Sequence, residues 1–303
     1  MTGMLEVLAT GPLSTVQDLG RPGYAHWGVT RSGAADRAAA RLANRLVGNP
    51  EGAACLEVTF GGLRLRADAD LVVALVGAPC PARVGTRPVP SNAPVDLPDG
   101  QELQLEPPDR GLRTYVAVRG GLDVPAVLGS RATDLLGQLG PEVLVDGDTL
   151  AVGNLHADYP PVEQAAVRGP SGGEVQLRIR WGPRHDRFTG EARSRLLADG
   201  WAAGQDSNRI GVRLRGPELP RSSEDELPSE GLVRGAIQVP PSGPPTLFLA
   251  DHPVTGGYPV IATVLDDDVD LAAQVRPGQR VRFRDVGAPS DRERGSPTGC
   301  PVT

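Results

Sequence analysis

The sequence predicts a mainly β protein with a few helices, divided into two lobes of similar length. Its 303 residues include 39 glycines and 30 prolines, which leave few uninterrupted stretches for long helices. Many apolar runs are short and are bounded by Gly, Pro or Asp, as strands are. A turn-and-strand pattern also occurs twice, once near the middle and once near the end of the chain.

The apolar runs have the length of strands. They cover residues 4–8, 71–76, 113–118, 143–152, 175–181, 231–239, 246–250 and 279–283. Helices are predicted over residues 33–46, 191–199 and 265–274. In the first helix Ser32 is the expected N-cap and Asp36 lies in the first turn, where a carboxylate is favourable.

The recurring pattern is an apolar residue, a tight turn with Asp or Pro-Gly, and then an alternating strand. It covers 145–152 and 275–283 and is typical of the closing strand of a barrel, although a common hairpin can also recur by chance. The stretch 158–173 between the two has three prolines and reads as a linker. We therefore predict lobes at 1–160 and 174–286, followed by a disordered tail at 287–303.

Composition excludes several functions. The 31 basic residues, all of them arginine, stand against 37 acidic residues, for a net charge of −6, so no nucleic-acid partner is expected. Because the chain has no lysine, it cannot house a Walker phosphate loop, a Schiff base or covalently attached biotin.

The cysteines and histidines indicate neither disulfides nor metal. Three widely spaced cysteines form no Cys-x-x-Cys pattern, and the four histidines lack metal-ligand spacing, so we predict no bound metal. No apolar stretch approaches 18 residues and the N-terminus does not resemble a signal peptide, so we expect a cytoplasmic protein with no membrane contact.

Polar residues gather in the first lobe between positions 15 and 36, among four glycines. Asp18, Arg21, Ser32 and Asp36 are candidates for a ligand site, with the alternative that Asp18 pairs with Arg21 and Ser32 only caps the helix. Arg119 ends a strand beside two glycines, where its guanidinium could bind a carboxylate or phosphate or form a surface ion pair. Glu57 is a weaker candidate, because a strand carboxylate is often solvated.

The second lobe has its densest polar cluster at residues 251–259, Asp-His-Pro-Val-Thr-Gly-Gly-Tyr-Pro, directly after an apolar strand. Glycines and prolines beside polar side chains are typical of a preformed pocket wall. The alternative for Asp251 is an ordinary turn aspartate. The candidates in this lobe are Arg209, Ser229, Glu230, Gln238, Asp251, Thr255, Gly256, Gly257 and Tyr258.

Several of these segments, in order, resemble one known family. They are Thr15-Val-Gln-Asp-Leu-Gly-Arg, Ser32-Gly-Ala-Ala-Asp, Ala43-Asn-Arg-Leu-Val-Gly-Asn, Ser229-Glu-Gly, Ile237-Gln-Val-Pro-Pro-Ser-Gly and Thr255-Gly-Gly-Tyr-Pro. The chain resembles the biotin-dependent carboxyltransferase-like proteins. These include the C subunit of bacterial ATP-dependent 5-oxoprolinase, the antagonist of the sporulation kinase inhibitor, the second subunit of allophanate hydrolase and the carboxyltransferase region of urea carboxylase.

The resemblance implies two cyclophilin-like β-barrel lobes that enclose a cleft. It implies one component of a hydrolase that opens the cyclic amide 5-oxoproline to glutamate with ATP, which another component could bind. Its partners would be the B subunit of 5-oxoprolinase, of the kinase-inhibitor type, and the A subunit. We predict Asp251, Glu230 and Tyr258 as catalytic residues and the other candidates of the two lobes, apart from Glu57, as substrate-binding residues.

Two alternatives remain. One is a carboxyltransferase that acts on urea or another amide with a separate biotin carrier. The other is a binding module without chemistry that antagonises a kinase-inhibitor-like partner.

Overall fold

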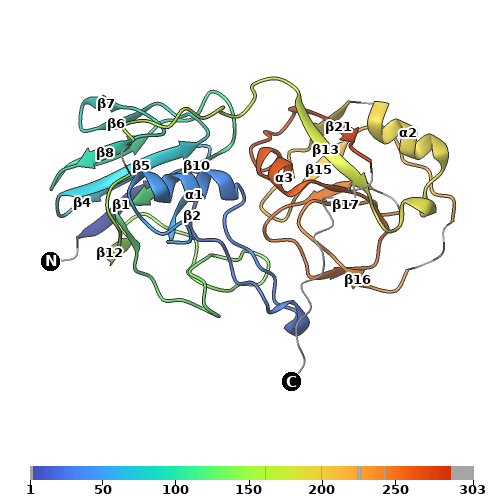
Figure 1. Cartoon of the computed structure of the whole chain (residues 1–303), viewed down its shortest axis with the longest axis horizontal. Coiled ribbons are helices and arrows are strands. Elements are labelled where there is room, and N and C mark those ends of the chain that lie inside the picture. The colour runs from blue at the N-terminus through green and yellow to red at the C-terminus, as the bar shows by residue number, and fades with distance from the viewer. Residues whose placement is uncertain are drawn as a thin grey trace.

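The computed structural model describes residues 3–160, 162–198, 200–223, 225, 227–241 and 243–287. The chain folds into two β-rich halves that lie side by side (Figure 1). Between the last strand of the first half and the first strand of the second, the described residues form no helix or strand. The predicted tail lies outside the described residues except for Gly287, and the predicted domain boundaries stay a prediction.

The N-terminal half consists of two sheets around a shared apolar core. Its strands are β1 (Met4–Thr10), β2 (Leu13–Gln17), β3 (Cys55–Thr59), β4 (Leu63–Ala67), β5 (Leu71–Gly77), β6 (Ala82–Val84), β7 (Arg87–Val89), β8 (Pro94–Leu97), β9 (Glu102–Leu105), β10 (Arg113–Val118), β11 (Gly120–Leu122) and β12 (Thr149–Leu155). The order is β11-β12-β1-β4-β9-β6-β7 in one sheet and β2-β3-β10-β5-β8 in the other. Inward-facing Leu63 and Leu65 of β4 alternate with arginines. An alternation of period two is typical of a strand with one buried face.

Helix α1 (Arg37–Leu46) covers the outer face of the five-stranded sheet, and η1 (Ala25–Trp27) is a single turn in the preceding loop. The alanines of α1 pack against Tyr115 and Ala117 of β10, which explains why every residue of β10 is buried. A strand that is covered on both faces has no side that faces solvent, and such strands tend to have continuous apolar sequences.

The C-terminal half contains a closed seven-stranded barrel, in the order β13-β20-β17-β18-β15-β14-β21. Its elements are β13 (Val175–Trp181), η2 (His185–Arg187), α2 (Gly190–Ala198), β14 (Trp201–Ala203), β15 (Gly211–Arg215), β16 (Glu230–Gly231), β17 (Ala236–Gln238), β18 (Thr246–Phe248), β19 (Thr255–Gly256), β20 (Val260–Val264), α3 (Asp266–Ala272) and β21 (Arg280–Asp285). Strands β16 and β19 form a separate two-stranded sheet. The prediction of a mainly β fold with few helices is confirmed.

Both predicted closing strands return to the first strand of their half. Strand β21 pairs in parallel with β13 and closes the barrel. Strand β12 pairs antiparallel with β1, but the hydrogen-bonded sheet of the N-terminal half stays open. The predicted strand 143–152 begins only at Thr149, because Val145 and Asp148 form a turn closed by hydrogen bonds between them. Within 231–239, a turn at Gly235, where φ is 89°, separates β16 from β17.

The N-cap prediction for the first helix is wrong. Helix α1 begins at Arg37, and the Asp36 carboxylate accepts a hydrogen bond from the Ala39 N–H at 2.9 Å. Ser32 and Gly33 instead adopt left-handed φ angles of 52° and 88°. A Cβ on Gly33 would lie 2.6 Å from the Gly20 nitrogen, so the loop passes there only without a side chain.

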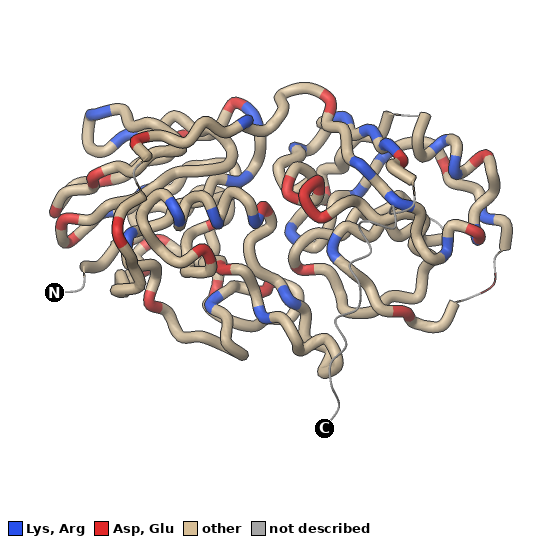
Figure 2. Tube along the Cα trace, viewed as in Figure 1, with Lys and Arg blue, Asp and Glu red and all other residues tan. Residues whose placement is uncertain are grey.

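Charged residues are interspersed along both halves, and the acidic start of α3 faces the junction between them (Figure 2). Among the helices of the described ranges, none combines the length and the apolar character that a membrane crossing needs.

Candidate functional site

Asp251 lies at the junction of the two halves and is fully buried. Its Oδ1 accepts hydrogen bonds from Ser32 Oγ at 2.6 Å and from Arg209 Nη2 at 2.9 Å. Its Oδ2 accepts from Arg209 Nε at 2.9 Å and from the Leu135 N–H at 3.3 Å. Both carboxylate oxygens are therefore occupied by protein donors, so this carboxylate anchors the base of the 251–259 turn.

Arg209 joins this carboxylate to a second one from the other half. Its Nη1 lies 2.5 Å from Glu57 Oε1, and its Nη2 donates to the Gly33 carbonyl at 2.7 Å. Glu57 also accepts from Tyr115 Oη at 2.7 Å and from the Ala35 N–H at 2.9 Å. We call Glu57, Arg209, Asp251 and Ser32 the Arg209 clasp.

The charges of the clasp stabilise one another. Burial opposes ionisation of Glu57, but the charges of Arg209 and Arg113 hold its pKa below the usual value. Burial also opposes the Arg209 charge, yet Asp251 and Glu57 raise its pKa. A buried ion pair with saturated hydrogen bonds is costly to break, because either partner alone would be an uncompensated charge.

A second contact across the junction centres on Gln274, which is 3% exposed. Its Nε2 donates to Asp36 Oδ2 at 2.7 Å and to the Arg113 carbonyl at 3.0 Å. Its Oε1 accepts from the backbone N–H groups of Leu112 and Arg113, both at 2.9 Å. Burial, together with the nearby Asp270 charge, raises the pKa of Asp36 to about 7.

Asp270 from α3 strengthens this contact at the start of α1. Its carboxylate accepts from the Arg37 N–H at 2.9 Å and the Ala38 N–H at 3.1 Å. Arg234 Nη2 in turn donates hydrogen bonds to Asp270 Oδ1 at 2.5 Å and to the Ala35 carbonyl at 2.7 Å. The free N–H groups of the first turn of α1 are thus capped partly from the other half of the protein.

Asp18 and Arg21 do not pair with each other. Asp18 accepts from Ser130 Oγ at 2.7 Å and from the Arg131 N–H at 2.6 Å, whereas Arg21 faces Asp134 at 3.5 Å. These contacts tie the loop after β2 to the loop after β11. Arg21 is 1% exposed, which leaves it no direct access to a solute.

Arg119 lies apart from the other candidates. Its Nη1 donates to the Val47 carbonyl at 2.9 Å and its Nη2 to the Ala157 carbonyl at 2.8 Å. The guanidinium also lies 3.9 Å from the ring centroid of Tyr159. It fastens the start of the linker to the end of α1.

The remaining candidates form an open rim around the 251–259 turn. Glu230 of β16 pairs with Gly256 of β19, so these two segments run side by side. Tyr258 is 49% exposed. The Tyr258 carbonyl accepts a hydrogen bond from Gln238 Nε2 at 3.0 Å. Ser229 and Thr255 are also exposed and Gly257 is partly exposed. We call Ser229, Glu230, Thr255, Gly256, Gly257 and Tyr258 the rim.

Glu230 is paired on this rim with Arg184, the residue before η2. Arg184 Nε lies 2.9 Å from Oε1 and 3.1 Å from Oε2 of Glu230, and Arg184 Nη2 also donates to Oε1. The two side chains are 37% and 30% exposed. The hydrogen bonds from Arg184 lower the pKa of Glu230. The predicted roles of these candidates stay predictions, but the structure separates a buried set from an accessible one.

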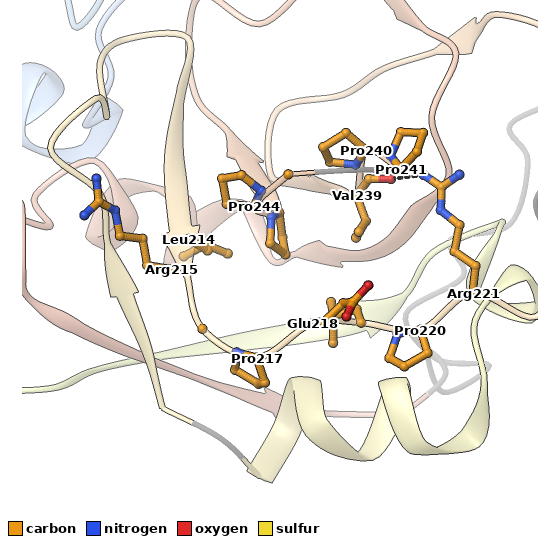
Figure 3. A pocket seen from close by; sticks show the side chains of 14 residues that line it. Leu214, Arg215, Pro217, Glu218, Pro220, Arg221, Val239, Pro240, Pro241 and Pro244 are labelled. Carbon is orange, nitrogen blue, oxygen red and sulfur yellow. Dashed lines mark hydrogen bonds between the residues drawn. The ribbon is translucent and has the colours of Figure 1, made fainter.

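A cavity of about 910 Å³ lies elsewhere on the barrel, between two proline-rich segments (Figure 3). Segment 214–221 forms one wall and residues 239–241 and 243–245 form the other, and Arg221 Nη2 donates to the Val239 carbonyl across them. The residues that line it include none of the candidates predicted from the sequence. Among the described residues, no three His, Cys, Asp or Glu side chains come together as metal ligands would. The expected lack of bound metal stays a prediction.

Sequence reasoning missed Arg184, Gln274, Asp270 and Arg234, and it rated Glu57 below the others. Glu57 was indicated by its place in a strand between Leu56 and Val58. No local pattern marks Gln274 or Arg184, since each meets its partners only through the fold.

Comparison with known proteins then decides the family. Residues 27–285 match the family model described as the carboxyltransferase domain, subdomain A and B. The chain belongs to this family. It is 38% identical over 283 residues to the C subunit of 5-oxoprolinase from Escherichia coli, covering 92% of this chain and 90% of that protein. It is 32% identical to the C subunit of 5-oxoprolinase from Haemophilus influenzae, covering 93% of this chain and 91% of that protein.

In longer relatives, the region similar to this chain is only one part of the protein. Urea amidolyase of Lachancea kluyveri is 30% identical, covering 92% of this chain but 17% of that protein. Among solved structures, TTHA0988 matches with a TM-score of 0.85 and 38% identity over 93% of this chain, which spans about half (55%) of that chain. The Kluyveromyces lactis urea amidolyase matches with a TM-score of 0.86 and 30% identity, over 92% of this chain and 18% of that one.

Proposed function

We propose that this protein is the C subunit of an ATP-dependent 5-oxoprolinase and helps hydrolyse 5-oxoproline to glutamate. One observation carries the proposal. The chain corresponds to nine-tenths of the length of two bacterial proteins named as that subunit, at up to 38% identity. Its relation to urea amidolyase is with a small part of a much larger chain.

The geometry supports a site on the rim. The lactam of 5-oxoproline is an unreactive amide, and phosphorylation or carboxylation of its oxygen or nitrogen would activate it. Backbone N–H groups near the partly exposed Gly256 and Gly257 are suited to developing negative charge on an amide oxygen. Tyr258, which is 49% exposed, is an accessible side chain that can donate or accept a proton there. Asp251, whose oxygens are engaged, would hold the turn in place for this work.

The proposal includes partners. The A and B subunits of 5-oxoprolinase would complete the enzyme, and ATP would bind to the complex. Because this chain has no lysine, an ATP site on it would lack the lysine of a Walker loop.

Reconstitution tests the proposal. The chain alone should show no 5-oxoproline-dependent ATP hydrolysis, and the mixture with the A and B subunits should. Tyr258→Phe should lower turnover about 100-fold if Tyr258 transfers a proton, with complex formation unchanged on gel filtration. A well-folded complex that stays inactive on 5-oxoproline would disprove the proposal.

A carboxyltransferase acting on urea or another amide is the second candidate, favoured by the family model and by the urea amidolyase matches. It would require a separate biotinylated carrier, since this chain cannot carry biotin covalently. Transfer of labelled carboxyl from a carboxylated carrier protein to urea, without 5-oxoproline turnover, would select it. Turnover of neither substrate, with tight binding of the B subunit, would instead favour a non-catalytic module.

A further inference from the structure

We propose that Arg184 binds the carboxylate of the substrate and that Glu230 occupies Arg184 until the substrate arrives. The inference rests on the proposed function, because 5-oxoproline is a lactam that carries one free carboxylate. It assigns a substrate-binding residue that lies outside the polar segments singled out in the sequence.

The arginines predicted from the sequence are engaged elsewhere. Arg21 and Arg209 are each 1% exposed and are held by buried carboxylates. Arg119 is bonded to two backbone carbonyls at the far end of α1. None of these three guanidinium groups reaches the rim, so a substrate carboxylate there needs another cation.

Arg184 meets that need by position. Its partner Glu230 lies directly opposite Gly256 in the β16–β19 pair, within the rim that also carries Tyr258. Both side chains of the pair reach solvent, at 37% and 30% exposure. The positive charge of Arg187 also lowers the pKa of Glu230, so a second cation acts on the same carboxylate.

The pairing geometry is that of a bound carboxylate. Arg184 Nε contacts both Glu230 oxygens, at 2.9 and 3.1 Å, and Nη2 contacts Oε1 as well. A guanidinium presents the same donors to any planar carboxylate. An exposed ion pair contributes little stability, so a substrate carboxylate can replace Glu230 at small cost. The exchange breaks no covalent bond. Arg184 and Glu230 keep their charges, and the substrate adds one negative charge.

The first experiment measures binding with two ligands that differ in the carboxylate. 5-Oxoproline and 2-pyrrolidinone have the same lactam ring, but the second lacks the carboxylate. We expect 5-oxoproline to bind the chain, alone or in the reconstituted complex, at least about 10-fold more tightly than 2-pyrrolidinone, the size of a charge-assisted hydrogen bond. Arg184→Gln should remove this discrimination, and Glu230→Gln should strengthen 5-oxoproline binding.

The matched control is Arg195→Gln. Arg195 is also 37% exposed and pairs with Glu191 at 2.6 Å, but on the surface of α2. It should retain full discrimination, and both arginine variants should unfold within a few degrees of the parent. If Arg184→Gln discriminates between the two ligands as Arg195→Gln does, or if the parent binds neither ligand, the proposal is overturned.

Kinetics of the reconstituted complex separates this proposal from the proposed function. Arg184→Gln should raise KM for 5-oxoproline about 10-fold or more and change kcat less, as loss of uniform substrate binding does. An active complex whose KM is unaffected by Arg184→Gln contradicts the role of Arg184 and leaves the 5-oxoprolinase assignment standing. A complex that binds 5-oxoproline through Arg184 but never turns it over contradicts the enzyme assignment alone.

Discussion

Two arginine–carboxylate pairs in the C-terminal half have the same chemistry and opposite surroundings. Arg209 and Asp251 are buried between the two halves, and every oxygen of Asp251 has a protein donor. Arg184 and Glu230 lie on the open rim with about a third of each side chain in solvent. The first pair fastens the halves together, and the second is free to exchange its partner.

The comparison indicates that burial, rather than residue type, separates an ion pair that holds the halves together from the exposed pair that we propose binds the substrate. A buried charge that loses its partner has no water to replace it, whereas an exposed one has. The following variants test that distinction, from the largest expected effect to the smallest.

Arg209→Ala should give the largest loss of stability. It leaves Glu57 and Asp251 as buried carboxylates without their shared cation, so the free energy of unfolding should fall by about 3–5 kcal/mol. Denaturant unfolding measures it, with Arg195→Ala as the control for removal of an exposed arginine. A loss below about 1 kcal/mol would mean that the clasp is not a tight contact.

Gln274→Ala should destabilise the junction by about 2–3 kcal/mol, since it removes the acceptor of the buried Leu112 and Arg113 N–H groups and the donor to Asp36. Gln274→Glu should do more harm, because it adds a carboxylate beside Asp36 and Asp270. Gln176→Ala, at an exposed position of β13, is the control. Hydrogen exchange at the start of α1 should increase in both Gln274 variants, and unchanged protection there would contradict the contact between the halves.

Asp36→Asn should change how stability depends on pH. Burial raises the pKa of Asp36 to about 7, so the native state holds this proton more tightly than the unfolded chain. Its contribution to stability is full below about pH 4 and is lost as pH rises through 7. The Asn variant, which can still cap α1, should therefore gain about 2–3 kcal/mol on the parent between about pH 5 and 8. Asp267→Asn, at an exposed position of α3, is the control. The free energy of unfolding is measured against pH, and a curve for Asp36→Asn that runs parallel to that of the parent would refute the prediction.

Arg184→Gln should have the smallest effect on stability, at most about 1 kcal/mol, as for other exposed ion pairs. The same denaturant measurement applies, and raising the salt concentration should weaken the parent's small advantage. A loss as large as that of Arg209→Ala would place Arg184 among the structural residues and remove the contrast between the two pairs.

Local pattern was sufficient for several elements. Strands β10 and β13 have the bounds expected from their apolar runs, and the last residue of α1 is the expected Leu46. The start of α1 was misplaced by four residues, because the capping preference of Ser32 was outweighed by a loop that turns this residue toward Asp251.

The candidate site was only partly predictable. The sequence singled out the 251–259 segment and Glu230, and the fold places Glu230 beside Gly256. It could not distinguish the buried Arg209 from an accessible arginine, nor find Arg184, whose partner is 46 residues away. Gln274 and Asp36 are 238 residues apart and meet across the junction, a contact that no local spacing encodes.

The sequence by itself determined the mainly β composition, the lack of lysine and the ordered segments that indicate the family. Only the tertiary structure decided which polar residues fasten the two halves and which face solvent. The physical reason is that burial arises from packing between distant segments. The same arginine and carboxylate become a clasp or an exchangeable pair according to what covers them.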